Sequence, residues 1–140
     1  MSWLQVYDLR QDLKEISNVQ EATLTTEHYG IEPTHGLFGS EQWWQHVENS
    51  TLPLHTMRGE ITRVYMAGMN DWPEFEFRCA DDSLHRFPRY VTPVGHLLDE
   101  EYVVGRHVEL DYVWQECRRK APNWGMARET MVVTAIRIAT

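Results

Sequence analysis

The stretch Arg106-His-Val-Glu-Leu-Asp-Tyr-Val-Trp-Gln115 decides the predicted fold, because its side chains alternate in character at every second position. One side of the stretch holds the apolar residues Val108, Leu110, Tyr112 and Trp114. The other side holds the polar residues His107, Glu109 and Asp111. A period of two is typical of a strand in an antiparallel sheet with one face buried. We therefore expect the apolar side to face a core and the polar side to face solvent.

Four further segments show strand-like patterns that are separated by turn residues. They are residues 60–66, 74–79, 84–90 and 130–139. Five strands within about 80 residues, each with one apolar side, need a shared covered interior. A small five-stranded antiparallel β-barrel or strongly curled sheet, of the OB-like or SH3-like type, is the simplest way to cover it.

The N-terminal part of the chain is predicted to be helical. Apolar residues recur at steps of three and four over residues 1–17, which favours an amphipathic helix that Ser2 could cap, with a strand starting at Trp3 as the alternative. Ser40 is a good N-cap for a short helix over residues 41–48. The predicted fold class is therefore α+β, with an N-terminal helical region packed on the five-stranded barrel.

No linker rich in glycine and serine divides the chain, so we expect a single domain over residues 1–140. Within it, residues 1–55 form the helical and loop part, and residues 56–140 form the barrel part. The length of 140 residues is typical of one domain that buries its own core.

The charge of the chain is acidic, with 13 basic and 21 acidic residues and a net charge of −8. This charge disfavours non-specific binding to nucleic acid or to anionic lipid. We find neither a signal-peptide pattern near the N-terminus nor an apolar stretch of membrane-spanning length. We therefore expect a cytoplasmic protein without a membrane partner, whose Cys79 and Cys117 are reduced.

No sequence motif points to a particular reaction. The chain has no nucleophile elbow, no phosphate-binding loop and no Cys-x-x-Cys pair. Its densest group of possible metal ligands contains His28 and His35, in a segment rich in turn residues. A small metal-binding protein or enzyme that uses these histidines is one alternative. The main expectation is a protein that is not an enzyme and has no cofactor.

Six tryptophans in a chain of this length favour a protein-binding function. Trp43 and Trp44 are neighbours on the predicted helix and point about 100° apart, so both cannot enter one narrow core. Trp72 lies at a predicted turn beside Pro73. We predict that Trp43, Trp44 and Trp72 contact a protein partner or a second copy of the chain, as in an adaptor, an acidic inhibitor or a homodimer.

A basic segment between the last two predicted strands offers an alternative function. It contains Arg118, Arg119, Lys120, Trp124 and Arg128. In an OB-like barrel, such a segment could contact phosphates and stack on a base of single-stranded nucleic acid. The net charge of the chain makes nucleic acid the less favoured partner.

Overall fold

The computed structural model describes residues 2–26, 29–92, 96–117 and 129–140. Its contacts divide the chain into two compact units. Unit 1 comprises Met1–Gln11, Thr56–Asp111 and Thr134–Thr140. Unit 2 comprises Asp12–His55 and Tyr112–Val133. Each unit is described separately below.

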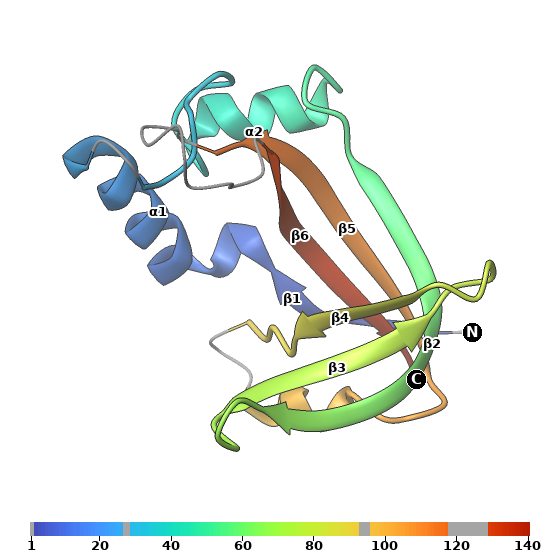
Figure 1. Ribbon diagram of the computed structural model, residues 1–140. Helices are drawn as coiled ribbons and strands as arrows, with labels where there is room; N and C mark the ends of the chain where they lie inside the picture. The colour runs from blue at the N-terminus through green and yellow to red at the C-terminus, as the bar shows by residue number, and fades with distance from the viewer. Residues whose placement is uncertain (1, 27–28, 93–95, 118–128) are drawn as a thin grey trace. The chain divides into compact units, whose positions relative to one another are not determined.

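In the described part of the chain, six strands form one sheet with the order β1-β6-β5-β2-β3-β4 (Figure 1). Their bounds are β1 Trp3–Asp8, β2 His55–Ala67, β3 Trp72–Arg78, β4 Leu84–Pro88, β5 His107–Glu116 and β6 Glu129–Ala139. The pairs β1–β6, β2–β3 and β3–β4 are antiparallel. The sheet is open, with β1 and β4 at the ends of the strand order.

The predicted fold class, a helical N-terminal region on a five-stranded barrel, is wrong. The five predicted strands correspond to β2–β6, but β1 adds a sixth strand at Trp3–Asp8, where a helix was expected. β1 pairs with the far end of the chain, since Trp3 lies opposite Ala139. Hydrogen bonds with this distant strand select the strand over the helix. The local apolar pattern fits both structures and therefore cannot distinguish them.

The first α-helix, α1, spans Leu13–Thr25 and follows a short 3₁₀ helix, η1, at Leu9–Gln11. Its N-cap is Asp12, whose Oδ1 accepts a hydrogen bond from the Glu15 N–H at 3.3 Å. The second helix, α2, spans Glu41–Glu48, and Ser40 Oγ accepts from the Trp43 N–H at 3.2 Å. The cap predicted at Ser40 is therefore confirmed, because an N-cap depends on neighbouring residues alone.

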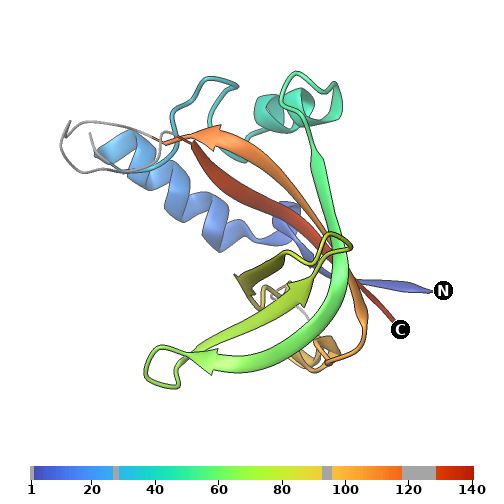
Figure 2. The ribbon, with the colours of Figure 1, turned by 45° about the vertical axis from the view of Figure 1, so that its right-hand side comes forward.

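Unit 1 contains the hairpins β2–β3 and β3–β4 and a 3₁₀ helix, η2, at His96–Glu101. Ile61 lies opposite Phe77, and both side chains are buried together with Phe75. The register of β2 shifts between Ile61 and Arg63, and the strand curves along its length (Figure 2). Gly59 lets the backbones of β2 and β3 approach each other closely, since a Cβ at this position would lie 2.5 Å from the Arg78 carbonyl oxygen. This core places the opposite face of the same strands toward solvent.

Unit 2 is built around Trp43 of α2, which has no exposed surface. Its Nε1 donates a hydrogen bond to Gln115 Oε1 of β5 at 2.9 Å, and its ring packs edge-on against Phe38 with centroids 5.1 Å apart. Gly39, with φ 74°, lies so close to α1 that an added Cβ would be 2.6 Å from Ile16 Cγ2. Unit 2 therefore has a core of its own.

β5 supplies buried side chains to both units. Along the strand, the buried apolar side chains shift from even-numbered to odd-numbered residues. Val108 and Leu110 are buried in unit 1, whereas Val113 and Gln115 are buried in unit 2. The prediction that Trp114 faces a core is therefore wrong, because 42% of this residue is exposed. Residues 112–114 are apolar in succession, so the sequence pattern could not show which side unit 2 buries.

Candidate functional site

One face of β2, β3 and β4 in unit 1 combines aromatic and charged side chains. Arg63, Trp72 and Arg86 are exposed on this face, whereas Glu76 is buried. The register places Tyr65 opposite Glu74, Arg63 opposite Glu76, and Glu76 opposite Arg86. Directly opposite residues in antiparallel strands point to the same side, as do residues two apart in one strand. We call this surface the Trp72 face, defined by Arg63, Tyr65, Trp72, Glu74, Glu76 and Arg86.

The polar groups of the Trp72 face hold one another in place. Tyr65 Oη donates to Glu74 Oε1 at 2.7 Å, and the Arg63 guanidinium lies 4.2 Å from the centroid of the Tyr65 ring. Arg86 Nε donates to Glu76 Oε2 at 2.9 Å. Two arginines and two glutamates make the face neutral. Trp72, with 53% of its surface exposed, is its large apolar member.

These contacts shift the pKa values of several groups. The Arg86 hydrogen bond and that of Thr62 Oγ1, at 2.9 Å, hold the pKa of the Glu76 carboxyl below its usual range despite burial. The same pairing raises the pKa of Arg86. Burial and then the hydrogen bond to Glu74 raise the pKa of Tyr65. Glu76 and Arg86 are therefore both charged at neutral pH, and Tyr65 keeps its proton.

Replacing Arg86 by glutamine should raise the pKa of Glu76, because the largest stabilising contact of its carboxylate is lost. Thr62→Val should raise this pKa by less. Carbon-detected NMR titration of the glutamate side chains measures both shifts. Arg78→Gln, two residues along β3 from Glu76, is the control and should leave the titration unchanged. An unchanged Glu76 midpoint in Arg86→Gln would contradict the pairing.

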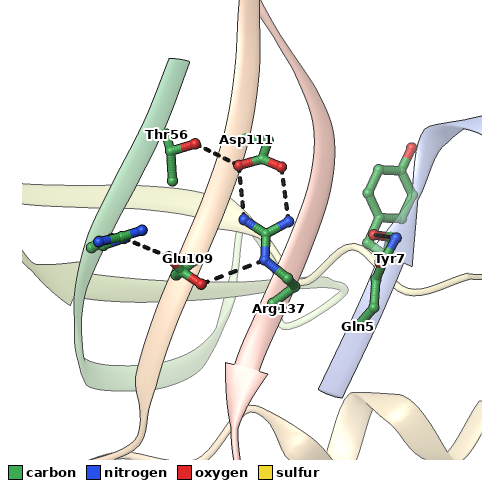
Figure 3. A network of polar contacts seen from close by, with 7 residues as sticks. Gln5, Tyr7, Thr56, Glu109, Asp111 and Arg137 are labelled. Carbon is green, nitrogen blue, oxygen red and sulfur yellow. Dashed lines mark hydrogen bonds and ion pairs between the residues drawn. The ribbon is translucent and has the colours of Figure 1, made fainter. Parts of the chain in front are cut away.

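A second polar network joins β2, β5 and β6 within unit 1 (Figure 3). Arg137 makes a bidentate contact with Asp111, from Nη1 to Oδ2 at 2.8 Å and from Nη2 to Oδ1 at 2.9 Å. Its Nε lies 3.5 Å from Glu109 Oε1, and Arg58 Nε donates to Glu109 Oε2. Thr56 Oγ1 donates to Asp111 Oδ1 at 2.7 Å.

The side chains of Glu109 and Asp111 are only 11% and 13% exposed. Burial opposes ionisation of Asp111, but the hydrogen bonds from Arg137 and Thr56 and the nearby arginine charges outweigh it and lower its pKa. The alternating sequence pattern predicts that both carboxylates face solvent. It does not show that arginines of the neighbouring strands pair with them. The charged side chains of this network are therefore paired with one another.

The structure separates the three tryptophans predicted as contact residues. Trp43 and Trp44 pack edge-on with ring centroids 4.7 Å apart in unit 2, whereas Trp72 belongs to unit 1. Trp43 is fully buried and Trp44 is half-buried. A buried ring cannot touch a partner while unit 2 is folded, and Trp72 is the most exposed of the three. Sequence reasoning did not single out Tyr65, because its pairing with Glu74 depends on the register.

Most residues of the two alternative sites lie outside the described residues. They are His28, Arg118, Arg119, Lys120, Trp124 and Arg128. The remaining residue, His35, packs edge-on against His46 with centroids 5.4 Å apart, and its Nδ1 lies 3.0 Å from Thr34 Oγ1. Across the described ranges, no group of three or more histidine, cysteine, aspartate or glutamate side chains could hold a metal ion.

The fold defines a protein built on one open β-sheet. A family model described as Immunity protein RhsI2 matches residues 4–139, and the chain belongs to this family. This membership confirms the prediction of a protein-binding module. No curated protein matches the chain. Among the described residues, no helix is both long and apolar enough to cross a membrane.

Proposed function

We propose that this chain binds a toxin protein and neutralises it, and that the Trp72 face makes the contact. The proposal is supported by the family to which the chain belongs. The observation that carries it is the 53% exposure of Trp72 on a strand face whose other side chains are already ordered.

The composition of the Trp72 face is that of a binding hot spot. Tryptophan, tyrosine and arginine dominate the energetics of protein interfaces, and the face presents Trp72, Tyr65 and Arg63. Because Tyr65 is held by Glu74, and Glu76 by Arg86, their rotamers are restricted before a partner arrives. Restricted side chains lose less conformational entropy on binding, which favours tight association.

Trp72→Ala should weaken binding to the toxin domain that the chain neutralises by about 30-fold, the loss typical of a hot-spot tryptophan. Isothermal titration calorimetry measures this change. Trp3→Ala is the matched control, because Trp3 is 40% exposed on β1 and lies outside the face. A Trp72→Ala protein with wild-type affinity would remove the Trp72 face from the proposal.

Neutralisation has its own test. An equimolar amount of the wild-type chain should abolish the activity of this toxin domain, whereas Trp72→Ala should require an excess. If the wild-type chain neither binds nor inhibits the toxin domain, the immunity function itself is wrong.

A further inference from the structure

Unit 2 carries a separate aromatic surface that the Trp72 face does not include. His55 stacks on Tyr112 with ring centroids 5.3 Å apart, and Tyr112 meets Trp114 edge-on at 5.9 Å. All three belong to unit 2. We call His55, Tyr112 and Trp114 the aromatic row.

The aromatic row is not part of the core of unit 2. That core takes Val113 and Gln115 from β5, so the alternate residues Tyr112 and Trp114 point away from it. Trp114 is 42% exposed and His55 is exposed. Glu116 follows two positions after Trp114, so its carboxylate leaves β5 on the same side as the aromatic row.

The charge of unit 2 indicates which partner chemistry suits this row. Its described residues include eight carboxylates and one cation, Lys14, and its other four cations all belong to residues 118–128. With those cations and Glu27 included, nine acidic and five basic residues leave unit 2 at −4. Unit 1 has the same net charge, with 12 acidic and eight basic residues, so both units favour a cationic partner.

We propose that the aromatic row is a second toxin contact, which receives a lysine or arginine side chain from the toxin. A cation over the face of tryptophan or tyrosine is attracted by the ring quadrupole. Glu116 adds a carboxylate on the same side of the strand, and the negative charge of unit 2 attracts a cationic protein surface from a distance. This inference rests on the proposed immunity function and names the chemistry of the partner.

The first test measures the affinity of the same toxin domain for Trp114→Ala and Trp114→Phe. Trp114→Ala should weaken binding by about 30-fold, and Trp114→Phe should retain most of the affinity because it keeps an aromatic face. Glu116→Gln should reduce the salt dependence of the association rate. Trp3→Ala is again the control, and circular dichroism confirms that each variant is folded. Wild-type affinity in Trp114→Ala overturns the inference while leaving the immunity function in place.

A second test does not depend on the toxin. A nine-residue peptide of alternating lysine and arginine should bind the wild-type chain at low salt, and Trp114→Ala should bind it more weakly. A matching peptide of glutamate and glutamine should not bind. Equal binding of the basic peptide to wild type and Trp114→Ala overturns the inference, whereas absence of toxin binding by the wild type overturns the proposed function.

Discussion

Replacing Trp43 by alanine should lower the free energy of unfolding by about 3–5 kcal/mol, the usual cost of removing a large buried aromatic side chain. Trp43 has no exposed surface, packs against Phe38 and Trp44, and ties α2 to β5 through Gln115. The cavity left by the indole cannot collapse fully, because the helix and the strand keep their backbone spacing. Since a domain of this size is stable by about 5–15 kcal/mol, the loss is a large fraction of the total.

Urea denaturation followed by circular dichroism measures this loss. Gln115→Ala separates the hydrogen bond from the packing, since it leaves the buried Trp43 Nε1–H without its acceptor and should cost about 1–3 kcal/mol. Trp3→Ala, on an exposed ring, should cost much less than Trp43→Ala. A Trp43→Ala protein as stable as the wild type would contradict the packing of α2 described above.

Replacing Arg137 by alanine should destabilise the chain by about 3 kcal/mol at neutral pH, near the lower end for breaking a buried ion pair. The change leaves Asp111 without its bidentate partner and Glu109 with Arg58 alone. Both carboxylates are largely buried, while Arg137 keeps 26% of its side chain exposed, which moderates the loss. Arg137→Lys should restore only part of the stability. A lysine keeps the positive charge but cannot make the bidentate contact.

The pH dependence of this loss follows from Asp111. Its pKa in the folded protein is lowered, so its contribution is present above the pKa of the unfolded chain, about 3.9, and is lost as pH falls through the folded value. The stability difference between wild type and Arg137→Ala should therefore be largest at neutral pH and shrink on acidification. Urea denaturation at pH 7 and near pH 3 measures both differences. A difference that grows toward low pH would contradict the assigned ion pair.

Part of the Trp72 face could be predicted from the sequence. Trp72 beside Pro73 lies next to a turn, and a large side chain next to a turn is frequently exposed. The pairs Tyr65–Glu74 and Glu76–Arg86 could not be predicted, because a shift of one residue in the register would move every partner to the other face. The exposure of Trp114 was hidden for a related reason, since it depends on which side of β5 unit 2 covers.

The sequence by itself determined the features that depend on neighbouring residues. These include the cap at Ser40 and the approximate positions of β2–β6. Tertiary structure alone decided that Trp3–Asp8 is a strand, that the sheet stays open and that Arg137 meets Asp111. Each of these depends on backbone or side-chain partners many residues away, and the local pattern of apolar and polar residues holds no information about such partners.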